Sequence, residues 1–541
     1  TDYSSKLPDE PGGDKEGNDP FTGQGGYDLV VSVKPNNEKF VVIGGTNAYK
    51  IDDITTSVTF KRIGGYANNS GYSLYNNHHP DIHVLEFDPN NSNVLFSGTD
   101  GGIHRTSNIS FANIFWQSLN NNYVTYQYYH IALDPLSGSN FVLGGAQDNG
   151  TTKGGTDSGE VDNTTMSSVA GGDGVAVGIA RRNADVDTQL YLGFQQGTIY
   201  TRDTGGGFRE ITPTNAPSGS LAQFVTYFYL DPDNNEQLYY AANGDLYKTN
   251  SSETVTSDTW ENIGGLLTFE SLKTFATTRG VYNSASSFLL IGGSKGGIFK
   301  VDDPKSVTSL TTAKNITPSG ATTNFGTIVS DIAIHPTNPD IVLATYANYG
   351  IDNIFLTTNA TSATPTWTMV ERNLSSHSIR SAAITQVGSE TIYFVGTARG
   401  LYSSTDPTTK DWEMEGANTI GLSLISGLVY RPSDNKLLIG THGNGMFETT
   451  VEGTLSTNEY TNNALEVSFY PNPTENELKI ESLSLDLNKN VKFRISDITG
   501  RTVKEGKLKN QTINVEKLNS GVYLMNLNVN GKKQDFKFIK Q

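Results

Sequence analysis

The sequence predicts an all-β protein: a β-propeller of about nine four-stranded repeat units, as one large wheel or as parts of two, followed by a small Ig-like β-sandwich. Three observations predict it: a phrase that returns about every 50 residues, a composition with 56 Gly and 10% aromatic residues, and a change of charge near residue 467. We divide the chain into an irregular segment (1–26), propeller repeats (27–450), a linker (451–466) and the sandwich (467–541).

The repeat is clearest in "HVLEFDPNNSNVLFSGTDGGIHRT" from His83, and eight variants of it lie between Tyr27 and Thr450. Each copy has runs of alternating apolar residues bounded by Pro-Asn or glycine turns, with no helical periodicity. A period of this size indicates a solenoid, propeller or array. Antiparallel meanders protect their edges by radial repetition, which favours one propeller blade per copy.

The four tryptophans fall at one place in the repeat, just after the expected third strand: Trp116, Trp260, Trp367 and Trp412. Phe60 and Phe208 stand at that place in two other copies. We expect all of them to pack between strands in like surroundings. In "TRDTGGGF", before Phe208, Asp203 is expected to cap the hairpin turn by accepting backbone N–H groups.

Composition and charge exclude several classes of function. The chain has no cysteine, so disulfides, zinc–thiolate sites and thiol nucleophiles are excluded. The net charge is −17, and the tail from Val467 has 13 Lys/Arg and 8 Asp/Glu, so the tail is +5 and the rest −22. An acidic body repels phosphate backbones, so nucleic acid is not an expected partner. No apolar run of about 18 residues occurs, so we expect no transmembrane segment and a chain whose targeting peptide has been removed.

The tail holds Tyr470-Pro471-Asn472-Pro473, then "ISDITGR" with Gly500, "LNSGVYLMNL" with Gly521 and Tyr523, and a terminal "KFIK". In order and spacing these phrases resemble the type A C-terminal sorting domain of the Bacteroidetes type IX secretion system. The resemblance spans residues 467–541. It implies that the type IX machinery is a partner and that the protein is exported to the outer-membrane surface or the extracellular space.

The body also resembles a family. The phrases "GQGGYDLVVSVKP", "HPDIHVLEFDPNNSNVLFSGTDGGIHRT", "GGAQDNGT" and "GGDG", between residues 23 and 203, are similar to BNR/Asp-box (sortilin-like) propeller proteins. That group includes the two-propeller glycosidases that cleave xyloglucan. The resemblance implies a propeller fold and leaves the activity open.

A first candidate site lies in "HHPDIHV". Alternate residues of a strand share a face, so His79, Asp81 and His83 can point together. Imidazole and carboxylate groups are a plausible ligand set for a divalent metal. The alternative is that the histidines bond loop carbonyls at the start of a blade. No other cofactor is expected.

A second candidate site is formed by acids in equivalent hairpins of consecutive copies: Asp100 in "GTDGG", Asp148 in "AQDNG" and Asp173 in "GGDG". Equivalent loops of neighbouring blades converge on one face of a propeller, and two carboxylates at a suitable separation would form the acid/base pair of a glycosidase. The alternative is that each aspartate simply caps its turn.

These features lead to two main hypotheses and a third. The first is a secreted or cell-surface propeller that binds an extracellular glycan or protein without catalysis. The second is a glycoside hydrolase of the two-propeller type. The third is a structural surface adhesin, which the sequence does not separate from the first. Candidate binding residues near the acids are Tyr123, Tyr126 and Tyr128 as stacking platforms, with His104 and Arg105.

Overall fold

The computed structural model describes residues 2–9, 21–56, 59–68, 72–121, 124–155, 166–182, 187–453, 468–481, 491–497, 499–529 and 532–541. The chain divides into two compact units, residues 1–453 and 454–541. Short 3₁₀ helices lie at Ser4–Lys6, Gln24–Gly26, Gln195–Gly197, Gly219–Leu221, Ser252–Thr254, Leu310–Thr312 and Arg372–Leu374. Among the described residues every other regular element is a strand.

The first two repeats form two antiparallel four-stranded meanders. One contains β1 (Val30–Val33), β2 (Val41–Gly44), β3 (Ala48–Ile51) and β4 (Lys61–Gly64), and the other β5 (Ile82–Asp88), β6 (Asn91–Thr99), β7 (Gly102–Thr106) and β8 (Trp116–Ser118). The second sheet packs its β5 against β1 and β2. A common apolar core that includes Val42, Leu85 and Trp116 holds the two sheets together.

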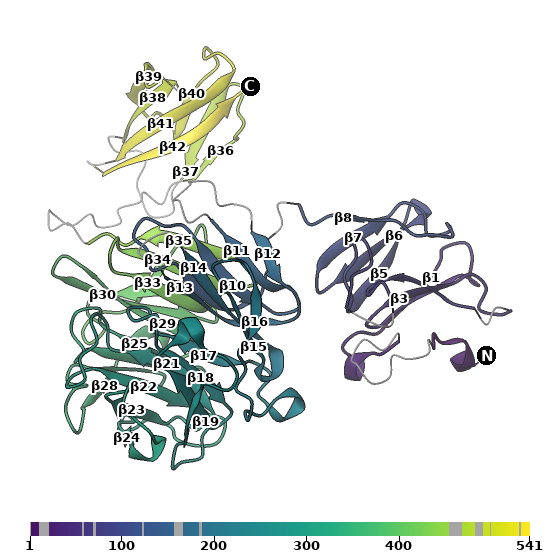
Figure 1. Cartoon of the computed structure of the whole chain (residues 1–541). Helices are drawn as coiled ribbons and strands as arrows, with labels where there is room; N and C mark the ends of the chain where they lie inside the picture. Colours follow the sequence, from purple (N-terminus) through teal and green to yellow (C-terminus); the bar gives the residue numbers. More distant parts are fainter. Residues whose placement is uncertain are drawn as a thin grey trace. The chain divides into compact units, whose positions relative to one another are not determined.

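The next seven repeats form seven further sheets. Their strands are β9 (Tyr128–Leu133), β10 (Val142–Ala146), β11 (Gly150–Gly154), β12 (Ser167–Ala170); β13 (Gly174–Arg181), β14 (Thr188–Phe194), β15 (Ile199–Arg202), β16 (Phe208–Glu210); β17 (Tyr227–Leu230), β18 (Leu238–Ala242), β19 (Asp245–Thr249), β20 (Glu261–Gly265); β21 (Leu272–Thr277), β22 (Phe288–Gly293), β23 (Ile298–Asp302), β24 (Lys314–Asn315); β25 (Val329–Ile334), β26 (Val342–Tyr346), β27 (Ile354–Thr357), β28 (Trp367–Met369); β29 (Ile379–Val387), β30 (Glu390–Thr397), β31 (Gly400–Ser404), β32 (Glu413–Glu415); and β33 (Leu424–Arg431), β34 (Lys436–His442), β35 (Met446–Thr450). Each sheet is a meander in sequence order (Figure 1).

These seven sheets close into a ring, because β9 packs against β33 and β34. The Arg431 side chain, 4% exposed, reaches from the last sheet of the ring to the first. It donates to the carbonyl oxygens of Asp134 at 2.6 Å and Ser139 at 2.9 Å. The backbone N–H of Gly138 donates back to Asp434 Oδ2 at 2.8 Å. The nine predicted units are therefore a closed wheel of seven and two sheets outside it, so the single large wheel is wrong and the alternative with parts of two wheels fits.

The four tryptophans have the like surroundings that the repeat predicts. Each indole Nε1 donates to a backbone carbonyl at or just beyond the end of the fourth strand of the preceding sheet: Trp116 to Ile63 at 2.5 Å, Trp260 to Ile211 at 2.7 Å, Trp367 to Ile316 at 2.8 Å and Trp412 to Val370 at 2.9 Å. Phe208 differs, because its side chain is 51% exposed. The tryptophans are thus scaffold residues that tie neighbouring sheets together.

The second unit is the predicted small β-sandwich. One sheet contains β36 (Ser468–Tyr470), β37 (Glu477–Glu481) and β40 (Thr512–Asn514), and the other β39 (Thr502–Lys507), β38 (Val491–Asp497), β41 (Gly521–Val529) and β42 (Lys532–Lys540). Ile495, Met525 and Phe538 are fully buried between them. Asn472 binds the backbone of β42, since its Oδ1 accepts from the Ile539 N–H at 2.9 Å.

Candidate functional site

Four aspartates from four separate segments come together, and we call Asp28, Asp81, Asp100 and Asp148 the carboxylate cluster. One carboxylate oxygen from each of Asp81, Asp100 and Asp148 lies within 4.8 Å of the others. Asp28 contacts this trio through Asp81 and through His83. The first three belong to the two outer sheets and Asp148 belongs to the ring, so the cluster is where these parts of unit 1 meet.

Tight turns place the cluster's side chains. Asp28 precedes β1, and Asp81 precedes β5 with a left-handed backbone at φ 60°. Asp100 lies in the turn between β6 and β7, and Asp148 lies in the turn between β10 and β11 at φ 57°. Aspartate tolerates the left-handed region better than most residues, because its short side chain can bond locally. The turn residues of the repeat thus also carry the acids of the site.

His83 lies behind the cluster and touches two of its members. Its Nε2 is 2.5 Å from Asp100 Oδ1, and its Nδ1 is 3.7 Å from Asp28 Oδ1. The Tyr27 ring packs edge-on against the imidazole, with 4.8 Å between centroids. Gln24 Nε2 donates to Asp81 Oδ1 at 2.6 Å. Within the described part of the chain, His83 is the only ion-pair partner of these four carboxylates.

Two hydrogen bonds connect the loop that carries Asp148 to the outer sheets. His79 Nε2 lies 3.0 Å from the Asp148 carbonyl oxygen, and Asn149 Nδ2 donates to the Asp100 carbonyl oxygen at 3.3 Å. The fit is tight at Gly101, where an added Cβ would lie 2.4 Å from the His79 side chain. A larger residue at position 101 would therefore displace His79 from the turn that carries Asp100.

Burial and mutual repulsion dominate the electrostatics of the cluster. Burial, followed by the neighbouring carboxylates, raises the pKa of Asp81 to about 8 and that of Asp148 to about 8. Burial also raises the pKa of Asp28, although nearby His83 lowers it in part. The repulsion reaches the surrounding tyrosines, because burial and then Asp81 raise the pKa of Tyr66 to about 12. The site therefore favours protons or another cation among its oxygens.

The structure merges the two sites that the sequence suggested separately. Asp81 and His83 from the predicted metal set meet Asp100 and Asp148 from the predicted acid pair. Asp173 binds the backbone of Asp148, since its Oδ1 accepts a hydrogen bond from the Asp148 N–H at 2.8 Å.

One predicted ligand lies outside the cluster and one member of the cluster was missed. The ring nitrogens of His79 face the carbonyl oxygens of Pro80 and Asp148, and His79 is not in the group of potential metal ligands formed by Asp81, Asp100 and Asp148. Asp28 was not predicted, and its only signal in the sequence is an acid directly after the Gly-Gly-Tyr turn.

Two of the predicted binding residues, Tyr128 and His104, are buried. Tyr128 is fully buried and its hydroxyl pairs with Thr152, so it cannot serve as a stacking platform. Tyr126 is half-buried against Tyr128. His104 is 4% exposed and packs on His78. Arg105 on β7 is half-exposed, and Tyr123 lies outside the described residues.

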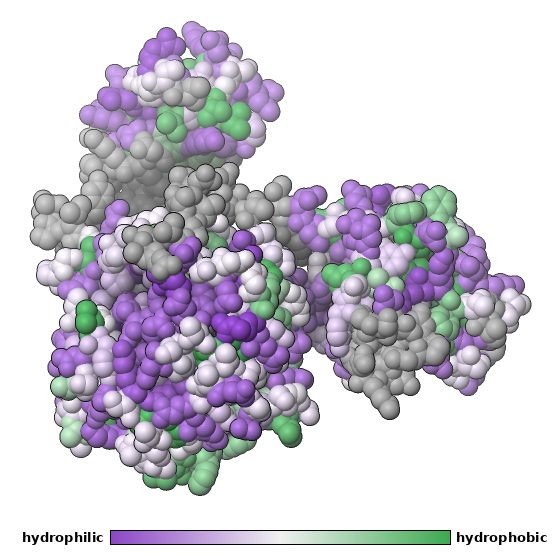
Figure 2. All heavy atoms as spheres, viewed as in Figure 1, coloured by the Kyte–Doolittle hydropathy of each residue, from purple (hydrophilic) through white to green (hydrophobic). Residues whose placement is uncertain are grey.

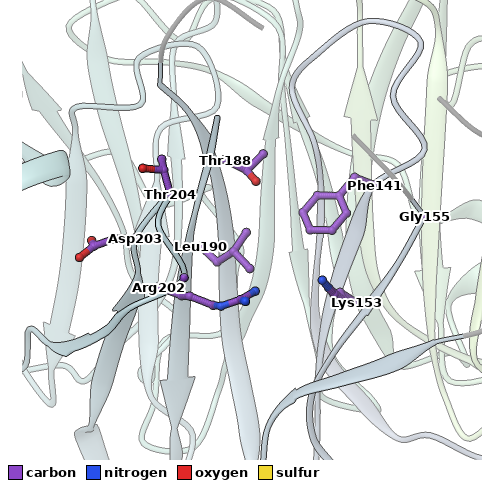
Figure 3. A pocket seen from close by; sticks show the side chains of 9 residues that line it. Phe141, Lys153, Gly155, Thr188, Leu190, Arg202, Asp203 and Thr204 are labelled. Carbon is purple, nitrogen blue, oxygen red and sulfur yellow. The ribbon is translucent and has the colours of Figure 1, made fainter. Parts of the chain in front are cut away.

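A pocket of about 300 Å³ lies between the first two sheets of the ring. Lys153 from β11 and Arg202 from β15 reach toward one another across it, with Phe141 at one side (Figure 3). Its rim includes Asp203, whose carboxylate accepts from the side chains of Gln189 and Arg209 at 3.2 Å each. These side-chain donors take the place of the backbone N–H groups expected at Asp203.

One face of the ring gathers exposed apolar side chains. We define the loop face as the loops that join the second to the third strand of a ring sheet and those that join one ring sheet to the next. Hydrogen bonds link these loops around the ring, for example from Leu272 N to Asn243 O and from Gly326 N to Ser294 O. The loop face carries Leu221, Phe224, Leu267, Phe269, Phe325, Ile328, Tyr349 and Leu422, all classed as exposed. Figure 2 shows apolar residues as separate small patches on a largely hydrophilic visible surface.

Several solved structures are similar to this chain. PorZ, an essential bacterial surface component of the type IX secretion system of Porphyromonas gingivalis, is 13% identical over 93% of this chain and 74% of its own, with a TM-score of 0.43. The GH74 xyloglucanase from Xanthomonas campestris is 15% identical over 77% of this chain and 58% of its own, with a TM-score of 0.48. The Cps50 (Swd1) β-propeller domain of Myceliophteria thermophila is 13% identical over 60% of this chain and 96% of its own, with a TM-score of 0.41.

None of the curated proteins matches the chain. Where the chain is described, none of its helices has the length and apolar character needed to cross a bilayer. A family model does match the second unit over residues 468–541, which include all the predicted sorting residues from Tyr470 to Tyr523. Residues 468–541 are thus a secretion system C-terminal sorting domain, and this domain assigns the chain to export, at the cell surface or outside the cell.

Proposed function

We propose that the exported propeller binds an extracellular protein and that the loop face is the binding surface. The observation that carries this proposal is the uneven distribution of exposed apolar side chains. Eight of them lie on the loop face, whereas Val281 is the single exposed large apolar residue in the described loops of the opposite face of the ring. Exposed apolar groups collected on one side of a molecule are typical of interaction sites.

The kind of side chain favours a protein over a glycan. Phe269 and Phe325 are 86% and 90% exposed, and they stand beside the aliphatic residues Leu267 and Ile328. Sugar-binding platforms combine aromatic rings with polar groups, whereas protein interfaces place aromatic and aliphatic anchors in apolar pockets of the partner. Because the body has a net charge of −22, the proposed partner surface is apolar at its centre and neutral or basic at its rim.

Site-specific photocrosslinking tests this proposal. A photoreactive phenylalanine at position 269 or 325 of the secreted protein is expected to capture one discrete protein on the cell surface, and the same group at position 281 is expected to capture none. Phe269→Ser is then expected to weaken binding of the purified partner at least tenfold, while Val281→Ser does not. Equal capture from both faces, or binding of the propeller to a glycan array alone, would contradict the proposal.

A glycoside hydrolase is the second candidate, and the proximity of Asp100 to Asp148 favours it. Retaining glycosidases hold their two carboxyl groups about 5 Å apart, and one carboxylate oxygen each of Asp100 and Asp148 lie within 4.8 Å of each other. Asp148, with its raised pKa, would act as the acid, and Asp100 would act as the nucleophile. Incubation with a panel of β-glucans, including xyloglucan, tests this candidate. If the protein is a glycosidase, it should hydrolyse one of these glucans. Asp100→Asn should abolish this hydrolysis, and chelation of metal ions should leave it unchanged.

A further inference from the structure

Geometry fits the carboxylate cluster to a single hard divalent cation. Two oxygens that ligate the same Ca²⁺ at about 2.3 to 2.6 Å are at most about 5 Å apart. The oxygens of Asp81, Asp100 and Asp148 satisfy this limit pairwise, since all lie within 4.8 Å of one another. They come from three different segments of the chain, so no single strand supplies them.

Asp28 provides the independent observation that points to a ligand. Its residue is fully buried, and neither of its carboxylate oxygens has a hydrogen-bond partner. It faces the cluster, because its Oδ1 approaches His83, whose other ring nitrogen touches Asp100, and because its carboxyl lies against that of Asp81. An ionised carboxylate only accepts hydrogen bonds, so two facing carboxyl groups satisfy each other only when one of them holds a proton. A buried carboxylate without a donor is costly unless a cation accompanies it.

The residues around the cluster do not balance its charge. The carboxylates form no ion pair with any lysine or arginine in the part of the chain that the structure describes. The single imidazole of His83 can carry at most one positive charge against four carboxylates. Its contacts with Asp100 and Asp28 resemble the outer-shell bonds that orient metal ligands.

We propose that Asp28, Asp81, Asp100 and Asp148 bind one calcium ion, which fastens the two outer sheets to the ring. Calcium accepts variable coordination geometry and so suits an all-oxygen site built from several separate segments, whereas magnesium demands a near-ideal octahedron and keeps several waters. The ion would join Asp148 of the β10–β11 turn to the three acids contributed by the outer sheets. The proposal does not depend on binding at the loop face.

The test begins with the full exported chain after removal of metal ions with a chelator. Titration with Ca²⁺ alone, followed by calorimetry, is expected to show one tight site per chain, and Ca²⁺ is expected to raise the melting temperature. Asp28→Asn and Asp148→Asn are expected to weaken Ca²⁺ binding at least tenfold. Asp245→Asn, at the first residue of β19 directly after the turn between β18 and β19, is the matched control and is expected to bind like the wild type.

A second measurement keeps the test valid if the ligand variants fail to fold. Tb³⁺ replaces Ca²⁺ in oxygen sites and emits when a nearby tyrosine is excited. Tyr27 packs on His83 beside the cluster, so Tyr27→Phe is expected to lower the sensitised emission severalfold at unchanged Tb³⁺ affinity. Absence of a calcium site in the folded wild type, Mg²⁺ binding as tight as Ca²⁺ binding, or absence of any tyrosine-sensitised Tb³⁺ emission would overturn the proposal.

Discussion

The indole N–H of Trp412 donates to the carbonyl oxygen of Val370 at 2.9 Å, and both residues are almost completely buried. Trp412 stands just before the fourth strand of its sheet, and Val370 directly follows the fourth strand of the preceding one. The bond therefore crosses the boundary between two blades. The other three tryptophans make the same bond to the preceding sheet. The regular spacing of the tryptophans in the sequence therefore corresponds to the bonds that join neighbouring blades.

Trp412→Phe is expected to destabilise the propeller by about 1 to 3 kcal/mol, because the Val370 carbonyl is left buried without a donor. Trp116→Phe should cost a similar amount for the same reason. Phe208→Leu is the control, since the exposed Phe208 side chain bridges no blades and its loss should cost less than about 0.5 kcal/mol. Chemical denaturation measures all three, and equal effects at the three positions would contradict the scaffold role of the tryptophans.

Arg431→Met is expected to weaken the closure of the ring by about 3 kcal/mol or more. The substitution removes two hydrogen bonds from Arg431 to carbonyl oxygens of the first ring sheet. It also leaves Asp434 without its ion-pair partner, the Arg431 guanidinium, which lies 2.7 Å from the Asp434 carboxylate. Arg372→Met, which breaks an exposed pair with Asp411, should cost less than about 1 kcal/mol. Thermal unfolding compares the two variants. A loss at Arg431 no larger than that at Arg372 would show that Arg431 does not hold the joint.

Asp231 gives a prediction about pH. Burial raises the pKa of this carboxyl from 3.8 to about 6, so between pH 4 and 6 the folded state holds a proton that the unfolded chain releases. Its contribution to the free energy of unfolding therefore falls as the pH rises through this window, by about 2 kcal/mol in all. Asp231→Asn keeps an oxygen for the Asp233 and Asn234 N–H groups and should remove this dependence. Chemical denaturation of the wild type and of Asp231→Asn at pH 4.5 and pH 7 measures this difference in the free energy of unfolding. An equal change with pH in the two proteins would contradict the prediction.

Removal of residues 468–541 is expected to abolish export while the first unit remains folded. The basis is that the two units have separate cores and that the sorting domain is confined to the second. Calorimetry of the truncated chain should show the propeller transition at an unchanged temperature. Cell fractionation should find the truncated chain retained in the cell. Normal secretion of the truncated protein would contradict this account of the sorting domain.

The sequence was a good guide to whatever depends on local chemistry. The patterns of hairpin turns and alternating apolar residues predicted the nine meanders. The tryptophans at equivalent positions of the repeat predicted how these residues pack. The acids were also found, because Asp100 and Asp148 stand in the same glycine-rich turns that shape the repeat. Each of these features depends on residues that lie within one copy of about 50 residues.

Features that depend on distant contacts could not be predicted. The choice of a seven-sheet ring rests on contacts such as Arg431 to Asp134, separated by 297 residues. Asp28 joins the cluster only because β1 packs beside β5, and nothing in its own segment marks it as a ligand. Tyr128 was misjudged as a platform because strand alternation does not say which face of an inner strand meets the next sheet.

The central claim is that the four aspartates share one calcium ion. Crystals of the full chain soaked in a lanthanide such as Tb³⁺ test it most directly, because anomalous scattering locates the ion without reference to any variant. We predict one strong peak among the carboxylates of Asp28, Asp81, Asp100 and Asp148. A map with no peak there, in which these carboxyl groups remain paired with one another, would contradict the account.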